Sequence, residues 1–393
     1  MNTSNDIFTQ PCRRQTSKLK NGLYSHLSQR IKHYLSKAQI EINGNNPWDI
    51  QVYNERLYPR VLAEGSLGLG ESYMDGWWEC HRLEEFFNRI LRIGLDRAVR
   101  SWKTIFDHLK ARMFNFQKIS RAYHVGKQHY DIGNDLYRCM LDELMIYSGA
   151  YWSEADTLDD AQKAKLDLVC RKLNLKPGMT LLDIGCGWGG TARFAAERYG
   201  VDVTGVTVSE EQVDFGRKMC RGLPVDLRLQ DYRSLNGTFD RILSIGMFEH
   251  VGYKNYRIFM EKTRELLKSD GLFVLQTIGA NRSTVRIDPW INKYIFPNAM
   301  LPSPVQLSAA VEGLFVIEDW QNFGPHYEKT LLEWHQNFQE NWNGLKHMYD
   351  DRFYRMWNYY LLSCAGTFRA RKNQLWQIVF SPKGVLGGYR PKR

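Results

Sequence analysis

The stretch of sequence that decides the fold is LDIGCGWGG, at residues 182–190. It begins inside an apolar run, Thr180–Ile184, of the kind that forms a buried strand, and it ends in closely spaced glycines. Because glycine adopts backbone dihedrals that other residues avoid, such a turn lets a ligand approach the backbone closely. A helix is expected next, over residues 192–199. A strand, a glycine turn and a helix in this order are typical of a Rossmann-like unit.

Strands and helices continue to alternate after this unit, which is the pattern of a doubly wound α/β sheet. Further strands are expected over residues 201–208, 225–229, 240–245 and 271–277, and helices over 210–220 and 253–267. The fold class that follows is a Rossmann-like α/β domain, preceded by a smaller and mainly helical domain. We place these two domains at residues 1–122 and 123–393.

The spacing of the glycines indicates which ligand the turn accepts. Its GxGxG pattern differs from the GxGxxG of nicotinamide enzymes, and no Gly-Lys-Ser or Gly-Lys-Thr P-loop sequence occurs. The turn resembles motif I of class I S-adenosylmethionine-dependent methyltransferases, and this resemblance implies that S-adenosylmethionine binds here. The residues that we expect to bind it are Tyr147, Ser148, Asp183, Gly185, Gly187, Gly189, Thr207, Ser209, Gln212, Gln230, Asp231, Tyr232 and Ser244.

The residues after the second and third strands need separate comment. Such methyltransferases commonly end the second strand in an acidic residue, but here Thr207, Ser209 and Gln212 would have to contact the ribose or the methionine. Asp231 follows the third strand, where adenine is usually held. Its other interpretation is a loop residue that caps a helical turn.

The composition limits the compartment and the partners of the protein. The 393 residues include 53 Lys and Arg against 43 Asp and Glu, a net charge of +10, and 13% are aromatic. A basic excess favours phosphate-bearing partners, either nucleic acid or anionic lipid. No apolar run reaches the ~20 residues of a membrane span and no signal peptide is evident, so a cytoplasmic location is expected. The 7 Cys are scattered without a CxxC pair, which argues against a disulfide framework and a thiolate zinc site, and no metal is expected.

The region before residue 123 contains amphipathic segments. Apolar residues share one face over Leu83–Leu91 and over Trp102–Met113, with basic residues on the flanks. Burial in the core of the domain is the commoner fate of such faces, and contact with a membrane is the alternative. The glycines of Gly65–Gly70 have a GxGxxG-like spacing, but no buried strand precedes them, so a dinucleotide site is not expected there.

Five further stretches resemble one family, that of the cyclopropane-fatty-acyl-phospholipid synthases. They are Gly65–Trp78 (GSLGLGESYMDGWW), His129–Asp135 (HYDIGND), Gly246–Gly252 (GMFEHVG), Asp288–Pro297 (DPWINKYIFP) and Tyr360–Arg369 (YLLSCAGTFR). The resemblance extends from about residue 50 to the end of the chain. It implies an enzyme that uses S-adenosylmethionine to methylenate the cis double bond of unsaturated acyl chains in membrane phospholipids. It also implies a homodimer that lies peripherally at the inner face of the membrane.

The resemblance assigns the catalytic chemistry as well. Methyl transfer to an alkene leaves a carbocation, which aromatic faces stabilise without trapping it. The candidates for this role are Tyr147, Tyr151, Trp152, Tyr327 and Tyr360. A bound bicarbonate then removes the proton, and the resemblance places its ligands at Glu249, Ile278 and Tyr327. Cys364 is a further candidate site residue, whereas His250 is interpreted as a packing residue rather than a base.

Two positions depart from the family pattern. Gly149 stands where the family commonly has Cys, and Gln276 stands where it has His. Gln donates a hydrogen bond but carries no positive charge, so bicarbonate binding or the fate of the carbocation could differ. This leaves a second hypothesis, a lipid C-methyltransferase that gives a methyl-branched or methylene acyl chain. A third hypothesis, a nucleic-acid-binding protein, rests on the net charge alone. No recognisable nucleic-acid-binding module occurs, so anionic phospholipid and no nucleic acid is the expected partner.

Overall fold

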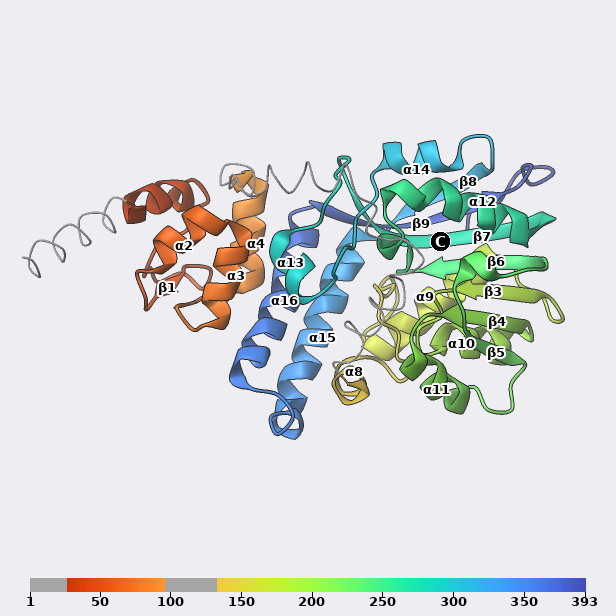
Figure 1. The fold of residues 1–393 in the computed structure, drawn as a ribbon, viewed down its shortest axis with the longest axis horizontal. Coiled ribbons are helices and arrows are strands. Elements are labelled where there is room, and N and C mark those ends of the chain that lie inside the picture. Colours follow the sequence, from red (N-terminus) through yellow and green to blue (C-terminus); the bar gives the residue numbers. More distant parts are fainter. Residues whose placement is uncertain (1–26, 96–132) are drawn as a thin grey trace, which may run out of the picture.

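The computed structural model of the protein describes residues 27–95 and 133–393. Figure 1 shows two units side by side, a small helical unit formed by the N-terminal residues and a larger unit built on a sheet. Two long helices, α15 (Gly324–Leu345) and α16 (Asp351–Arg369), lie between them. The boundary predicted near residue 123 lies outside the described residues, and so do the predicted segment Trp102–Met113 and the first part of the His129–Asp135 stretch.

The larger unit contains a sheet with the strand order β5-β4-β3-β6-β7-β9-β8. Its strands are β3 (Thr180–Ile184), β4 (Asp202–Thr207), β5 (Val225–Leu229), β6 (Phe239–Ile245), β7 (Leu267–Ala280), β8 (Val316–Asn322) and β9 (Asn373–Ser381). The pairs among β3–β7 are parallel, whereas β9 runs antiparallel to both of its neighbours, β7 and β8. Strand order therefore reverses beside β3, which is where α/β sheets bind ligands.

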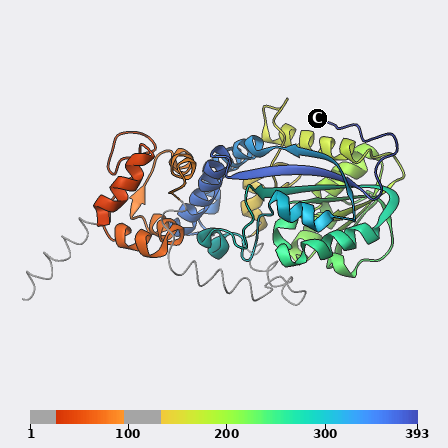
Figure 2. The same cartoon turned by 90° about the horizontal axis from the view of Figure 1, so that it is seen from above.

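Helices cover both faces of this sheet, as Figure 2 shows. They are α9 (Leu158–Lys172), α10 (Gly190–Tyr199), α11 (Glu210–Met219), α12 (Tyr256–Leu266) and α14 (Pro304–Val311). Successive strand residues point to opposite faces. Leu181 and Leu243 accordingly pack with α9 and α10, and Leu182 and Ile242 pack with α12 and α14. Apolar residues at consecutive strand positions are therefore all buried, as parallel sheets require.

The strands that the sequence predicts between residues 180 and 277 are confirmed as β3–β7. Strand β7 is longer than expected, because it runs on to Ala280 and so includes Ile278. The expected helix over 253–267 begins as a 3-10 turn, Tyr253–Asn255, before α12. Strands β8 and β9 were not predicted. They pair with each other across the long α15–α16 hairpin, and no local pattern reports such a distant pairing.

The small unit is built from short elements. Residues 27–37 are helical, followed by β1 (Gln51–Val52), α2 (Leu57–Glu64), α3 (Ser66–Met74), β2 (Trp78–Glu79) and α4 (Leu83–Arg92). The apolar face of α4 packs on α16, where Phe87 lies so close that a Cβ at Gly366 would come within 2.5 Å of it. Leu83, Phe86 and Phe87 are buried, whereas Ile90 and Leu91 are half-buried and line a cavity, so this face packs on α16 rather than only in the core of its own unit.

The glycine run begins at Gly65, the N-cap of α3, and its other two glycines, Gly68 and Gly70, lie within that helix. Its glycines permit close packing of neighbouring elements. A Cβ at Gly68 would come within 2.6 Å of the Arg60 carbonyl oxygen, and one at Gly70 would collide with the indole of Trp290. Trp290 belongs to α13 (Pro289–Tyr294) of the larger unit, so Gly70 brings the two units together, whereas Gly68 packs α3 on α2.

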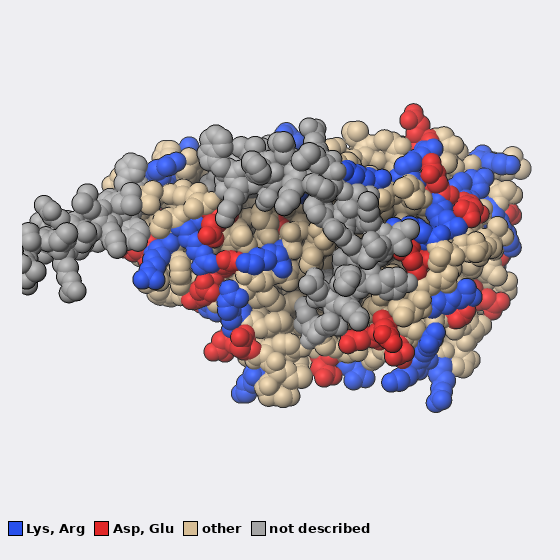
Figure 3. Space-filling model, in the orientation of Figure 1, with Lys and Arg blue, Asp and Glu red and all other residues tan. Residues whose placement is uncertain are grey.

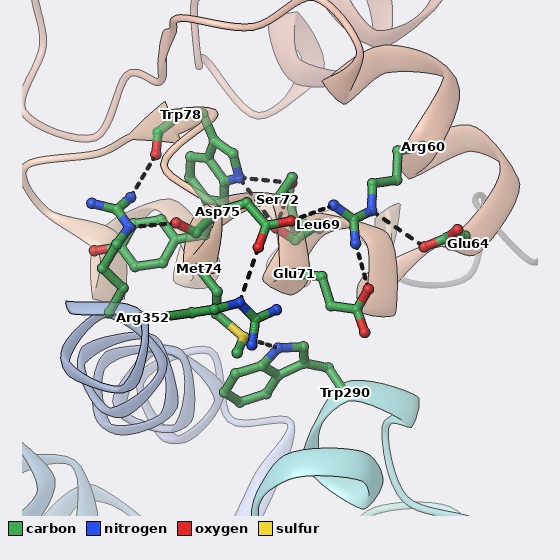
Figure 4. Close-up of polar contacts among 12 residues, drawn as sticks. Arg60, Glu64, Leu69, Glu71, Ser72, Met74, Asp75, Trp78, Trp290 and Arg352 are labelled. Atoms are coloured by element: carbon green, nitrogen blue, oxygen red, sulfur yellow. Dashed lines mark hydrogen bonds and ion pairs between the residues drawn. The ribbon is translucent and has the colours of Figure 1, made fainter. Parts of the chain in front are cut away.

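Charged side chains reinforce the contact between the units, as Figure 4 shows. Asp75, at the end of α3, lies between the guanidinium groups of Arg60 (2.8 Å) and Arg352 (3.1 Å). Glu71 accepts from the hydroxyl of Tyr294 (2.9 Å) and pairs with Arg60 and Lys293. Helix α3 is thus tied to α13 and α16. Within the described ranges, no helix is both long and apolar enough to cross a membrane.

Candidate active site

A cavity of about 800 Å³ opens at the carboxyl ends of β3, β4, β6 and β7. It extends from the glycine turn after β3 to the small helical unit, where its wall is apolar and includes Leu57, Val61, Phe86 and Ile90. The position agrees with the ligand crevice of α/β sheets. The cavity therefore joins a polar end near the sheet to an apolar end beneath α2 and α4.

The glycine turn forms part of the polar end. Gly185, Gly187 and Gly189 have φ values of +87°, +54° and +83°, which side chains disfavour. A Cβ at Gly187 would meet no atom within 4 Å, whereas one at Gly185 would press on Met247 and one at Gly189 on Leu227. Gly187 also lines the cavity. It is therefore the position at which a side chain would take the space of a ligand rather than that of the protein.

Most of the residues predicted for the nucleoside end line this cavity. Thr207, Gln212, Gln230, Asp231 and Tyr232 all do so. The hydroxyl of Thr207 donates to Oε1 of Gln212 (2.8 Å), which fixes both side chains. Asp231 caps the 3-10 turn Tyr232–Ser234 and is held by the guanidinium of Arg233 (2.8 Å), so it has the capping role as well as a place in the cavity wall.

Besides Gly189, whose Cβ would press on Leu227, two serines predicted to bind S-adenosylmethionine lie outside the cavity wall. Ser209 accepts from the backbone N–H of Gln212 and caps α11. Ser244 is fully buried and donates to the carbonyl of Ile184 (2.9 Å), the residue before the glycine turn. Both support residues of the wall, and neither reaches the open space.

Aromatic rings surround the middle of the cavity. The hydroxyls of Tyr147 and Tyr360 lie 2.8 Å apart, and Phe296 and Tyr327 complete this part of the wall. Burial raises the pKa of each of these three tyrosines well above 10, so they stay neutral. Tyr151 and Trp152 are not part of the wall. The indole N–H of Trp152 instead donates to Thr330 (3.0 Å).

Glu249 brings a carboxyl group into this apolar region. It follows β6 in the 3-10 turn Phe248–His250, and its Oε1 accepts from the backbone N–H of Ile278 on β7 (2.6 Å). Its Oε2 is buried and has no hydrogen-bond partner. Burial raises the pKa of Glu249 to about 7. Glu249, Ile278 and Tyr327 all line the cavity, and the Ile278 N–H that was expected to bind bicarbonate donates to Glu249 instead.

The two residues that depart from the family pattern are in contact beside this carboxyl group. The side-chain amide of Gln276 donates to the carbonyl of Gly149 (3.3 Å) and accepts from Gln377 of β9 (2.8 Å). A Cβ at Gly149 would come within 2.6 Å of Leu375 and 2.9 Å of the Tyr327 ring. The Tyr327 ring therefore packs where a side chain at position 149 would begin. Gln377 was missed from the sequence because β9 was not predicted.

The remaining candidates are neutral groups. Cys364 of α16 lines the cavity, and burial raises the pKa of its thiol to about 12. The thiolate that a nucleophile needs is thus disfavoured. His250 lines the cavity as well, and burial lowers its pKa to about 4, so its imidazole is neutral and a weak base. Within residues 27–95 and 133–393, no group of three or more acidic, His or Cys side chains could hold a metal ion.

Comparisons with known proteins identify relatives along most of the chain. Residues 117–378 match the family described as mycolic acid cyclopropane synthetase. The chain is 54% identical over 360 residues to the cyclopropane-fatty-acyl-phospholipid synthase of Escherichia coli (strain K12), covering 91% of this chain and 94% of that one. It is 40% identical to a probable fatty acid methyltransferase of Pseudomonas putida, covering 90% and 92% of the two chains.

Solved structures agree with these relatives. The cyclopropane synthase MmaA2 from Mycobacterium tuberculosis is 32% identical, with a TM-score of 0.62 over 66% of this chain and 97% of its own. The mycolic acid cyclopropane synthase CmaA1, in a complex with S-adenosylhomocysteine, is 33% identical, with a TM-score of 0.61 over 66% of this chain and 97% of its own. The predicted methyltransferase fold is therefore confirmed.

Proposed function

The chain belongs to the mycolic acid cyclopropane synthetase family of methyltransferases, and from this premise we propose that it forms cyclopropane rings on unsaturated acyl chains of membrane phospholipids. The observation that carries the proposal is the carboxyl group of Glu249, buried in an aromatic wall between the glycine turn and the apolar end of the cavity. An acyl chain is apolar and suits that end. The carboxyl group supports the one step of the reaction that requires a polar group, the removal of a proton.

S-Adenosylmethionine supplies the methyl group, activated by a positively charged sulfur, and the residues of the polar end fit it. Gly187 leaves space for a ligand at the glycine turn. Thr207, Gln212, Gln230 and Asp231 offer hydrogen-bonding groups to a nucleoside. The aromatic wall keeps water away from the reacting atoms, which an alkene requires because it is a weak nucleophile.

The reaction requires a bond to form from the alkene to the methyl carbon while the bond from that carbon to sulfur breaks. The other alkene carbon becomes cationic. Tyr147, Tyr327 and Tyr360 offer ring faces to this charge and no thiolate or amine that would trap it. Loss of a proton from the transferred methyl then leaves the electron pair that closes the ring.

Bicarbonate, as the acceptor of that proton, fits the residues around Glu249. The unpartnered Oε2 of Glu249 is placed to accept the O–H of the ion, which turns its basic oxygen away from the carboxylate. The Tyr327 hydroxyl is the donor that would hold it, because the backbone N–H of Ile278 already donates to Oε1 of Glu249 and so holds the carboxyl group in place. The uncharged amide of Gln276 adds no cation, so binding depends on neutral donors.

We also propose that residues 1–122 dock the enzyme on the membrane, with a homodimer at the inner face of the cytoplasmic membrane as the working form. The net charge of +10 and the apolar end of the cavity in the small unit support docking on anionic phospholipid. On the part of the face that Figure 3 shows in colour, basic and acidic side chains are interspersed. Binding to anionic vesicles should weaken as salt rises, because each basic group contributes on the order of 1 kcal/mol that ions screen. Equal binding to neutral and anionic vesicles at all salt concentrations would contradict this part.

A second candidate function is C-methylation without ring closure. The contact between Gln276 and Gly149 favours it, because both positions differ from the family pattern beside the proton acceptor. A carbocation that loses a proton from a carbon of the acyl chain gives a methyl-branched alkene, and one that undergoes a hydride shift and then loses a proton from the transferred methyl gives a methylene group. Mass spectrometry of the lipids from expressing cells distinguishes a saturated ring from these products.

A further inference from the structure

Two buried polar residues of α9 hold the segment that carries Tyr147 and Ser148, and the function described so far gives them no role. The side-chain amide of Gln162 donates to the carbonyls of Ile146 (3.3 Å) and Ser148 (2.8 Å). The ammonium of Lys165 donates to the hydroxyl oxygen of Ser148 (3.0 Å). Lys165 is 1% exposed, a rare position for a lysine in a protein interior.

Ser148 lies where the two turns after β3 and β6 meet. A Cβ at Gly246, in the turn after β6, would be 3.9 Å from the Cβ of Ser148. The same segment touches the start of α10, because a Cβ at Gly190 would collide with the carbonyl of Leu144. Ser148 lines the cavity beside the glycine turn, away from the wall residues Gln230–Tyr232 that follow β5.

The hydrogen bond from Lys165 determines what Ser148 offers to a ligand. An ammonium group has donors only, so the Ser148 oxygen accepts from it. The hydroxyl hydrogen of Ser148 then points elsewhere, and no other hydrogen bond of this hydroxyl is present among the described residues. A hydroxyl that already accepts from a cation is a stronger donor, so it favours an anionic acceptor in the cavity.

The charged groups around Lys165 suit the amino-acid end of the co-substrate, S-adenosylmethionine. Burial lowers the pKa of Lys165 to about 7, and Asp142 and Asp183 attract its ammonium form and oppose that shift. Asp142 is occupied by the backbone N–H groups of Leu144 (3.0 Å) and Ile146 (2.9 Å). Asp183 lines the cavity, and its Oδ2 is buried with no hydrogen-bond partner. The Ser148 hydroxyl, a donor for an anion, and Asp183, an acceptor for a cation, thus line the same cavity. A zwitterionic amino acid presents one group for each of them, a carboxylate for Ser148 and an ammonium for Asp183.

We propose that Lys165 is a positioning residue for the amino-acid end of S-adenosylmethionine, which it orients through the hydroxyl of Ser148. The proposal rests on the proposed function, because that function names the co-substrate. Lys165 does not touch the ligand. In its ammonium form it fixes the direction of the Ser148 hydroxyl, and it places a positive charge behind that hydroxyl, on the side away from the ligand carboxylate.

The test compares two ligands that differ at this end. S-Adenosylhomocysteine has the amino-acid group, and 5′-methylthioadenosine lacks it. Calorimetry should show that Lys165→Met and Ser148→Ala each weaken S-adenosylhomocysteine by about tenfold or more, the value of one hydrogen bond to a charged group. Binding of 5′-methylthioadenosine should change less than about twofold. The matched control is Lys163→Met, which removes an exposed lysine of the same helix that pairs with Glu143.

The double variant Lys165→Met/Ser148→Ala should bind S-adenosylhomocysteine no more weakly than the poorer single variant, since the two residues act as one unit. Equal losses for both ligands would show a merely structural role, and an unchanged affinity for S-adenosylhomocysteine would also overturn the proposal. If Lys165→Met does not fold, the selectivity of Ser148→Ala decides by the same criteria. Failure of the unmodified protein to bind either ligand would instead contradict the proposed function.

Discussion

The backbone N–H of Ile278 donates to Oε1 of Glu249 at 2.6 Å, across the carboxyl ends of the neighbouring strands β7 and β6. This bond fixes one carboxyl oxygen and leaves Oε2 buried without a partner in the cavity. The relationship depends on β7 running beyond its predicted end, because only then does Ile278 lie in the sheet beside the turn after β6.

Replacement of Glu249 by Gln should lower lipid turnover by about 100-fold or more, the contribution typical of an aligned acid–base group. The amide keeps the shape of the side chain but loses the charge that accepts the bicarbonate O–H. Affinity for S-adenosylhomocysteine should stay unchanged, because the nucleoside wall is separate. The matched control is Glu261→Gln, which alters an exposed carboxylate on α12. Near-normal turnover of Glu249→Gln in bicarbonate-depleted buffer would refute the assignment.

The same substitution should change the pH dependence of stability. Glu249 has a pKa of about 7 when folded against an ordinary value of 4.5. Between these values the unfolded chain loses the proton and the folded chain keeps it, so rising pH destabilises the unmodified protein. The penalty is complete above the folded pKa and absent below the unfolded one, and it reaches about 3 kcal/mol.

Glu249→Gln escapes this penalty, so its free energy of unfolding should exceed that of the unmodified protein at about pH 8 and match it at about pH 4. Urea unfolding monitored by circular dichroism measures the difference. If the difference between the two free energies of unfolding does not increase as the pH rises, Glu249 titrates like an exposed carboxylate.

Gly187→Val should abolish binding of S-adenosylhomocysteine while the protein remains folded. Its side chain would project into open space, since a Cβ there meets nothing within 4 Å, and the cavity is that space. Gly178 provides the control, because it has a similar positive φ of +80°, also meets nothing within 4 Å, and does not line the cavity. Calorimetry that detects undiminished binding by Gly187→Val would remove this turn from the site.

Gln276→His should lower the bicarbonate concentration that gives half-maximal activity. An imidazole in this position adds a cation when protonated, and the uncharged amide does not. The variant also loses the hydrogen bonds of Gln276 to Gly149 and Gln377, so its affinity for S-adenosylhomocysteine is the internal control. An unchanged dependence on bicarbonate would mean that position 276 does not face the ion.

The sequence predicted the parts of the site that follow directly from local patterns. The strand and glycine turn at residues 180–190 predicted the nucleoside end, because a positive φ and a close approach require glycine. The sequence did not predict that Gln377 and Lys165 belong to the surroundings of the site. Gln377 reaches Gln276 only through antiparallel pairing over a separation of 101 residues, and a lysine in a helix is ordinarily an exposed residue.

The most direct test of the central claim is mass spectrometry of phospholipids from cells that express the unmodified protein, with cells expressing Glu249→Gln as the control. We predict unsaturated acyl chains that have gained one CH₂ and lost the double bond to a ring, and none of this product with the variant. Acyl chains that carry a methyl branch or keep an alkene would contradict cyclopropane formation and establish the second candidate function.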